Sequence, residues 1–172
     1  MRYLIQERIF SLTNDFWIED ENGNRVFFVD GRALSIRDTF ELRDAAGTLR
    51  AIIRKKLLSV RDTMTIEDAD GVLATVKPAW FSPLRHRYEI ELADGSSLEA
   101  TGNFVDKDWQ IVTGDGVVVG QVSRQWFRIR DTYGVDVAPG ADDALIIAVA
   151  VCIDRLHEDQ EHGDRDRSGF RF

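Results

Sequence analysis

The chain has 172 residues, of which 44% are hydrophobic and 10% are aromatic. This length suits one folded domain and is too short for two of ordinary size, and the composition excludes a disordered chain. The formal net charge of -8 and the sequence pI of about 4.9 argue against a general nucleic-acid binder, which would present a basic surface. We therefore expect one globular domain with a sizeable core and no nucleic-acid partner.

The sequence also bears on the cellular compartment. Residues Met1 to Arg8 are interrupted by charge before an apolar signal-peptide core can form. The longest apolar stretch, Ala144 to Ile153, is about half of the roughly 20 residues that a membrane-spanning helix needs. The single cysteine, Cys152, lies in this stretch and is expected to be a buried, unreactive thiol. We expect a cytoplasmic protein without a transmembrane segment, and peripheral attachment to a membrane is the alternative.

Turn signals recur along the chain at a regular spacing. Gly23, Gly47, Gly71 and Gly95 are 24 residues apart, each follows Asp or Asn within three residues, and Gly114–Gly116 continues the series. Asp and Asn bond to the backbone of a turn and Gly accepts a positive φ, so each cluster predicts the tip of a β-hairpin. The 24-residue units share little sequence, so the period reflects hairpin geometry and not true repeats.

The segments between these turns alternate apolar and polar residues, as in Tyr88–Leu92, which is typical of strands with one buried face. Two strands for each turn, with an opening strand near Tyr3 to Phe10 and a closing pair near Trp126 to Val137, give about a dozen antiparallel strands. A sheet of this size is expected to close on itself, because closure removes the unpaired edges. We therefore predict a mainly β protein with a closed antiparallel barrel.

A change of pattern follows the last strand. Pro139 and Gly140 stop the strand, and Asp142 and Asp143 provide an N-cap and a negative first turn for a helix over about 142–156. Ala144 to Ile153 contains no polar side chain, so every face of this helix must be buried. The predicted arrangement is a hydrophobic C-terminal helix inside the barrel, which leaves little room for an internal ligand.

These elements divide the chain into two parts. Residues 1–158 form the predicted barrel domain with its central helix, and residues 159–172 form a polar, flexible tail. The polar residues that follow Ile153 are expected to leave the barrel at once. The aromatic end of the tail, Phe170 and Phe172, could dock on a partner, but a loose terminus is the expectation.

Three segments, Ile53–Thr63, Trp126–Val135 and Asp142–Arg155, resemble the LURP-one-related family of the tubby C-terminal-like superfamily, which also contains the phospholipid scramblases. The resemblance runs from about Tyr3 to Leu156. It implies a twelve-stranded barrel around a central hydrophobic C-terminal helix, in agreement with the residue pattern. It implies no established enzymatic activity. Tubby-type relatives bind phosphoinositides, but no matching phosphoinositide motif is found in this sequence.

The common signatures of catalysis are missing from the sequence: no nucleophile elbow, no phosphate-binding loop and no zinc-protease helix motif. His86, His157 and His162 form no pair at helical spacing, so no metal site is expected and surface positions are the expectation for them. We expect a protein that is not an enzyme and has no cofactor.

The carboxylates at the two ends of the predicted helix are candidates for a calcium site. Asp142 and Asp143 could hold a hard cation together with Asp154 or Glu158. A helix of about 11 residues separates the two pairs by roughly 16 Å, so helix capping explains the first pair better.

The run from Arg50 to Arg61 is basic in an otherwise acidic chain, and a second basic group surrounds apolar residues near Trp80. Together they could form a membrane-surface site, in which cations face lipid headgroups and aromatic side chains insert among them. The candidate lipid- or anion-binding residues are Arg54, Lys55, Lys56, Arg85 and Arg87, and the candidate membrane or partner contacts are Trp80 and Phe81. The alternative is structural: the cations pair with acidic neighbours and the aromatic residues cap one end of the barrel.

The sequence thus favours a non-catalytic binding or scaffold domain of the LURP-one-related type whose partner is an unknown protein. The alternative is a peripheral membrane domain that binds anionic phospholipid or phosphoinositide through the basic patch. If the cations converge on one face, the second hypothesis gains support.

Overall fold

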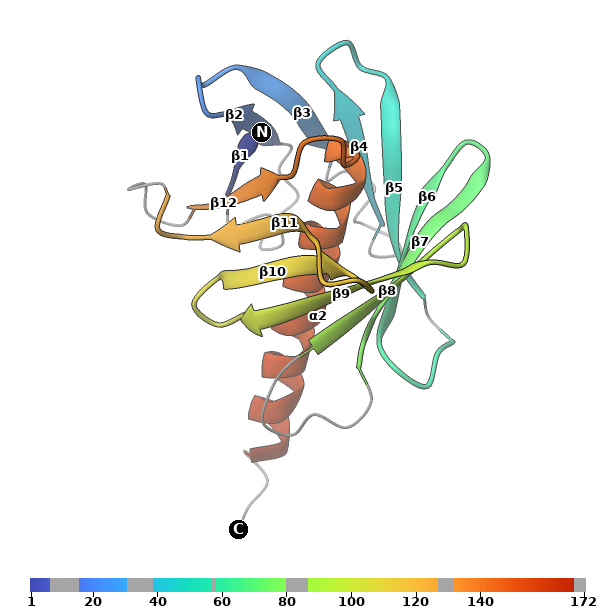
Figure 1. The fold of residues 1–172 in the computed structure, drawn as a ribbon. Coiled ribbons are helices and arrows are strands. Elements are labelled where there is room, and N and C mark those ends of the chain that lie inside the picture. Colours follow the sequence, from blue (N-terminus) through green and yellow to red (C-terminus); the bar gives the residue numbers. More distant parts are fainter. Residues whose placement is uncertain (7–15, 31–38, 57, 80–86, 127–131, 169–172) are drawn as a thin grey trace.

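A computed structural model describes residues 1–6, 16–30, 39–56, 58–79, 87–126 and 132–168, with side chains as far as residue 161. Among these residues, twelve strands form a closed barrel around one long helix, α2 (Figure 1). The strands are Arg2–Gln6 (β1), Phe16–Asp20 (β2), Arg25–Asp30 (β3), Thr39–Asp44 (β4), Leu49–Lys56 (β5), Thr63–Asp68 (β6), Gly71–Pro78 (β7), Arg87–Leu92 (β8), Ser97–Asn103 (β9), Asp108–Thr113 (β10), Val118–Ser123 (β11) and Thr132–Val137 (β12).

Each strand pairs antiparallel with its neighbour in the sequence, and β1 closes the barrel against β12. In this closing pair, Tyr3 lies opposite Val135 and Ile5 lies opposite Tyr133. Closure gives both edges of the meander a hydrogen-bonding partner. The predicted closed antiparallel barrel of about twelve strands is therefore confirmed.

The regular turn signals form tight turns between consecutive strands. Gly23, Gly47 and Gly95 have φ of 79°, 85° and 86°, a region that disfavours side chains with a Cβ atom. In the first turn, the Asp20 carboxylate accepts hydrogen bonds from the backbone N–H groups of Asn22 and Asn24 at 2.9 and 2.8 Å. Asp44 and Asp94 play the same part in their turns. The 24-residue period is thus a repeated turn geometry.

Alternation along the strands separates the core from the outer wall. On β8, Tyr88 and Ile90 are buried at 1% and 0% exposure, while Glu89 and Glu91 face outward. Because the side-chain period of a strand is two, the buried residues of all twelve strands face the same interior. The barrel therefore has an apolar lining and a charged outer wall.

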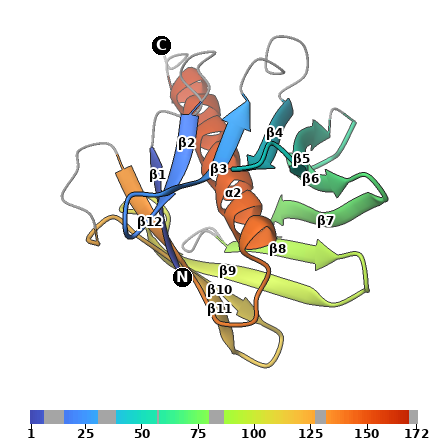
Figure 2. The same cartoon turned by 90° about the horizontal axis from the view of Figure 1, so that it is seen from above.

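The helix α2 (Asp143–Ser168) runs through the middle of the barrel, as the view from above shows (Figure 2). Every residue from Ile146 to Ile153 is at most 2% exposed. Gly120 on β11 allows this close fit, since a Cβ atom there would lie 2.8 Å from Cγ2 of Ile146. Asp142 caps the helix, because its Oδ1 accepts a hydrogen bond from the backbone N–H of Leu145 at 3.1 Å. The predicted central hydrophobic helix is confirmed.

The helix is longer than the sequence predicted. It continues beyond residue 156 to Ser168, and residues 169–172 lie outside the described part of the chain. Asp154 and His157 are only 4% and 6% exposed, so the polar residues after Ile153 do not leave the barrel at once, and His157 is not at the surface. The sequence pattern did not predict this, because the partner of Asp154 inside the barrel, Lys107, is distant in the sequence.

The connections alternate between the two ends of the barrel, because every strand is antiparallel to the next. We call one end the turn end: it holds the turns between β2 and β3, β4 and β5, β6 and β7, β8 and β9, and β10 and β11, and α2 starts there. We call the opposite end the loop end: it holds the connections 58–62 and 104–107 and the polar part of α2 from Asp154 onward. None of the described helical residues form a helix long and apolar enough to cross a membrane.

Candidate functional site

The loop end contains a buried ion pair between the barrel and the helix. The Asp154 carboxylate on α2 contacts the Lys107 ammonium group, which comes from the connection between β9 and β10. The two side chains are 3% and 12% exposed. The second oxygen of Asp154, Oδ2, is buried and has no hydrogen-bond partner in the described part of the chain. The Asp154 charge therefore depends on Lys107 for compensation.

The backbone at Lys107 is unusual for a lysine. Its φ is 53°, in the left-handed region where a Cβ atom crowds the following carbonyl group. The backbone N–H of Arg124 binds the Lys107 carbonyl oxygen at 3.1 Å, which fixes the connection against the end of β11. Glycine or asparagine would occupy this position with less strain. The ion pair with Asp154 gives a physical reason for a lysine there.

A second ion pair joins β5 to the helix. The Lys55 ammonium group donates to Oδ2 of Asp159 at 2.8 Å, and the other oxygen of Asp159 lies 3.5 Å from Nε of Arg155, one helical turn earlier. Lys55 and Asp159 are 22% and 20% exposed, so the pair is largely shielded from water. Lys55 has the strand parity of the buried residues Ala51 and Ile53, and it therefore points into the mouth of the barrel.

Aromatic and polar side chains fill the space next to these pairs. The Tyr88 hydroxyl donates to Oε1 of Gln160 at 3.4 Å, and the Tyr88 ring packs edge-on against Phe104 at 4.9 Å between centroids. The His157 ring lies 6.2 Å from the Phe104 ring. Burial raises the pKa of the Tyr88 hydroxyl above its ordinary value, so it stays neutral. The described interior at this end is thus occupied by the protein's own side chains.

Cross-strand ion pairs cover the outer wall between β5 and β9. Arg54 binds Glu67 at 3.1 Å on β6, and Lys77 on β7 binds Glu91 on β8 at 2.6 Å. Arg87 on β8 pairs with Glu99 on β9. These pairs are partly exposed and each stabilises the fold by about 1 kcal/mol or less. The pairs also change the charge of the surface, because each of these cations is neutralised by a carboxylate.

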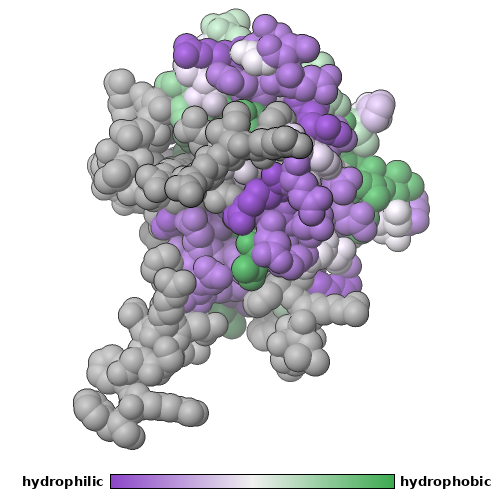
Figure 3. All heavy atoms as spheres, turned by 90° about the vertical axis from the view of Figure 1, so that its left-hand side faces the viewer, coloured by the Kyte–Doolittle hydropathy of each residue, from purple (hydrophilic) through white to green (hydrophobic). Residues whose placement is uncertain are grey.

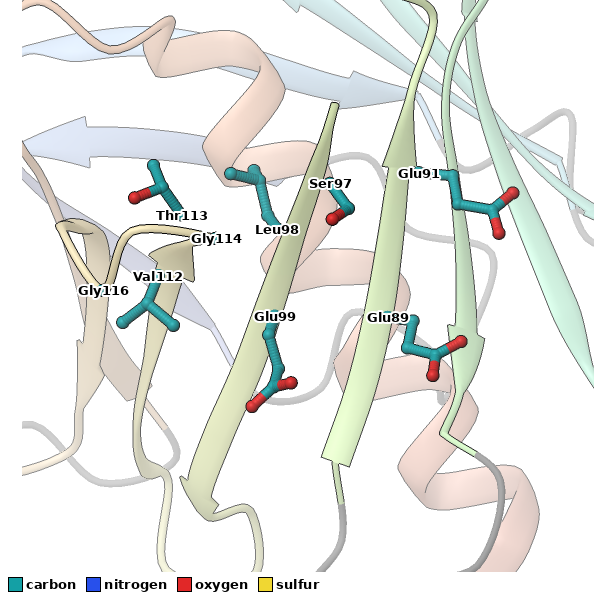
Figure 4. Close-up of a pocket in the computed structure, with 9 residues that line it drawn as sticks. All are labelled: Glu89, Glu91, Ser97, Leu98, Glu99, Val112, Thr113, Gly114 and Gly116. Atoms are coloured by element: carbon teal, nitrogen blue, oxygen red, sulfur yellow. The ribbon is translucent and has the colours of Figure 1, made fainter. Parts of the chain in front are cut away.

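A shallow, open groove of about 500 Å³ runs over β8, β9 and β10 on this wall. Glu89 and Glu91 project from β8 to the same side, and Glu99 lies on the adjacent strand (Figure 4). Glu89 and Glu99 are directly opposite in the strand register, an arrangement that cations must offset. Arg87 pairs with Glu99, and the Lys77 hydrogen bond lowers the pKa of Glu91. Glu91 and Glu99 of the groove are therefore members of the ion pairs on the outer wall.

The face on the left of Figure 1 is mostly hydrophilic wherever its atoms are described, and hydrophobic atoms gather there in small separate groups (Figure 3). Among the described residues, no group of three or more His, Cys, Asp or Glu side chains is arranged to hold a metal ion.

Exposed apolar side chains stand out in the connection between β5 and β6 at the loop end. Leu58 and Val60 are 94% and 95% exposed, the highest values among the large hydrophobic residues of the described chain. Lys56, the last residue of β5, is exposed beside them, and Ser59 lies between them. We call residues 58–60 the apolar loop. Two nearly fully exposed apolar side chains thus lie close together in the sequence beside a cation.

The structure divides the predicted basic patch. Arg54, Lys56 and Arg87 lie on the outer side near the loop end, but Arg54 and Arg87 are in ion pairs. Lys55 points inward to Asp159 and is no part of the outer surface. Arg85, Trp80 and Phe81 lie outside the described residues, as does His86. The role of the patch in binding lipid or other anions stays a prediction.

The relatives of this chain can be assigned from comparisons of sequence and fold. The sequence model of the LURP-one-related family matches residues 1–154, nearly the full length. This chain belongs to the LURP-one-related family. The matched residues end at Asp154, so the Lys55–Asp159 pair involves a part of α2 that lies beyond the match.

The fold agrees with this assignment. The X-ray structure of a protein from Arabidopsis thaliana is similar to this LURP-one-related chain, with a TM-score of 0.68 and 20% sequence identity over 91% of each chain. At this identity the likeness concerns the fold alone. No curated protein matches the chain.

Sequence reasoning missed two features of this LURP-one-related chain. The buried pair of Lys107 and Asp154 was signalled weakly, by a charged residue directly after an apolar helix that had no room to leave the barrel. The apolar loop was signalled by Leu58 and Val60 between cations in a segment that does not alternate like a strand.

Proposed function

We propose that this chain is a non-catalytic binding domain that contacts its partner with the loop end of the barrel. The observation that carries the proposal is the apolar loop, where Leu58 and Val60 are 94% and 95% exposed. Exposed apolar side chains at the end of a rigid scaffold are common in protein contact surfaces. The barrel interior is filled by α2, which directs binding to the outside.

The contacts of the buried charged residues at the loop end favour a structural role for them over a catalytic one. Asp154 and Asp159 are held by Lys107 and Lys55, respectively, and join the helix to the barrel. A general acid or base must reach a substrate, which is difficult for a carboxylate enclosed by the fold.

A second candidate partner is an anionic phospholipid surface. The supporting observation is the exposed Lys56 directly before the apolar loop, a combination that suits shallow insertion among lipid headgroups. One lysine contributes about 1 kcal/mol near an anionic membrane, and Arg54 and Arg87 contribute less while paired with carboxylates. The net charge of -8 opposes the approach, so any affinity is modest.

The experiment for the first candidate compares proteins retained from the lysate of the cells that produce this chain. The baits are the wild type, a Leu58→Ser/Val60→Ser double variant, and a Val117→Ser control from the turn end, where Val117 is 59% exposed. A specific partner should be retained by the wild type and the control and lost by the double variant. Identical retention by all three baits contradicts the proposal.

The experiment for the second candidate is co-sedimentation with neutral and anionic vesicles at low and high salt. We expect salt-sensitive binding to the anionic vesicles alone, weakened about fivefold by Lys56→Ala and more by the double variant. Equal sedimentation with neutral vesicles, or no effect of the variants, excludes this use of the loop.

A further inference from the structure

Ser59 lies in the exposed connection between β5 and β6 at the loop end. It lies between Leu58 and Val60, which are 94% and 95% exposed, and it is itself exposed. The connection that carries it leaves β5 and returns to β6 at the lower right of Figure 1. A hydroxyl group in an exposed connection can be reached by another enzyme without unfolding of the barrel core.

The charges before Ser59 form a pattern that the strand geometry presents outward. Lys56 is three residues and Arg54 is five residues upstream, and both are exposed on the outer side of β5, where Arg54 is paired with Glu67. An apolar residue, Val60, follows directly. Many protein kinases select their acceptors through such charge patterns, with acidic subsites for upstream cations. Upstream cations and a following apolar residue therefore make Ser59 a candidate acceptor for such a kinase.

Another exposed serine of the chain gives a contrast. Ser96 lies in the turn between β8 and β9, and its hydroxyl binds Asp94. The five residues before it include Glu91 and Asp94 and no cation. Ser96 is thus exposed like Ser59, but the residues before it are acidic where those before Ser59 are basic.

We propose that Ser59 is the acceptor of a phosphoryl group transferred from a nucleoside triphosphate by a protein kinase that recognises upstream basic residues. The Ser59 Oγ forms a new bond to the γ-phosphorus, the bond from this phosphorus to the bridging β-phosphate oxygen breaks, and the nucleoside diphosphate leaves. The hydroxyl proton passes to the catalytic base of the kinase. The assignment does not depend on which partner the loop end binds.

The local contacts show what this modification changes. The Ser59 hydroxyl donates to the carbonyl oxygen of Arg61 and lies 2.9 Å from Oγ1 of Thr63, so it holds the connection in its present turn. A phosphoryl group removes this donor and adds about 1.5 to 2 negative charges beside Lys56. The apolar loop then leaves its turn and loses its local positive charge. Phosphorylation would therefore act as a switch on the surface of the loop end.

The test uses the purified full chain with ATP and the catalytic subunit of a serine/threonine kinase that prefers upstream basic residues. Intact mass and peptide mapping measure the site and the rate for the wild type, Ser59→Ala, Lys56→Glu and the control Ser96→Ala. We expect one phosphoryl group at Ser59, none in Ser59→Ala, an unchanged rate in Ser96→Ala, and a rate about tenfold lower in Lys56→Glu. No transfer to the folded wild type, transfer that persists in Ser59→Ala, or an unchanged rate in Lys56→Glu would overturn the proposal.

Discussion

The Lys55 ammonium group on β5 lies 2.8 Å from the Asp159 carboxylate on α2 and joins the wall of the barrel to the helix inside it. Its sequence neighbour Lys56 points to the opposite side, into solvent. Two adjacent lysines of one basic run therefore belong to two different parts of the molecule.

This relationship predicts unequal effects of the same substitution. Lys55→Glu places a negative charge against Asp159 in a largely shielded position and should lower the free energy of unfolding by roughly 1 to 3 kcal/mol. Lys56→Glu changes an exposed residue and should stay within about 0.5 kcal/mol of the wild type. Urea denaturation of the two variants measures both effects. Equal loss of stability would show that Lys55 does not face the helix.

The buried pair at the loop end predicts strong coupling between two positions. Lys107→Met leaves the Asp154 charge buried without compensation and should cost about 3 to 5 kcal/mol. The double variant Lys107→Met/Asp154→Leu removes both charges and should recover most of that loss. A double-mutant cycle from denaturation curves measures the coupling. Additive losses would mean that the two side chains do not interact.

The parts of the fold that the sequence predicted are those controlled by local chemistry. Turn residues such as Asp20 and Gly23 specify a hairpin through their own backbone, so each tip could be placed. A segment such as Ala144 to Ile153 without a polar side chain must be surrounded, and a barrel is the arrangement of strands that surrounds a helix. These two patterns were enough for the architecture.

The candidate site could be predicted only in part, because it depends on pairs that are distant in the sequence. Lys55 and Lys56 look alike in a basic run, and only the register of β5 against the helix separates an inward from an outward charge. The pairing of Arg54 with Glu67 likewise needs the strand alignment. A basic sequence run therefore overstated the free positive charge of the surface.

The central position of the helix predicts a severe effect of one buried charge. Ile147 is 0% exposed, so Ile147→Asp places an uncompensated carboxylate inside the barrel and should cost more than about 4 kcal/mol. That loss is comparable with the total stability of an ordinary domain. Circular dichroism and thermal melting measure it, with Val117→Asp at the exposed turn end as the control. A folded Ile147→Asp variant would refute the enclosed helix.

The thiol of Cys152 reports on the same helix. Burial raises its pKa above the ordinary value of 9.0, so the thiolate that reacts with disulfide reagents is scarce in the folded protein. Above about pH 9 the unfolded chain loses this proton and the folded chain keeps it, so stability falls as the pH rises. We expect reaction with such a reagent to be slow in the native protein and fast in denaturant. The Cys152→Ala variant should lack this residue's share of the alkaline loss of stability.

Amide hydrogen exchange of the native chain, measured by mass spectrometry, tests two claims most directly. The first is that the helix fills the barrel, and the second is that the exposed loop end is the surface that contacts a partner. We expect the slowest exchange for residues 146–156 of α2, near the limit of global unfolding, and the fastest for residues 58–60. Slow exchange in the apolar loop together with rapid exchange in α2 would contradict both the enclosed helix and the exposed contact surface.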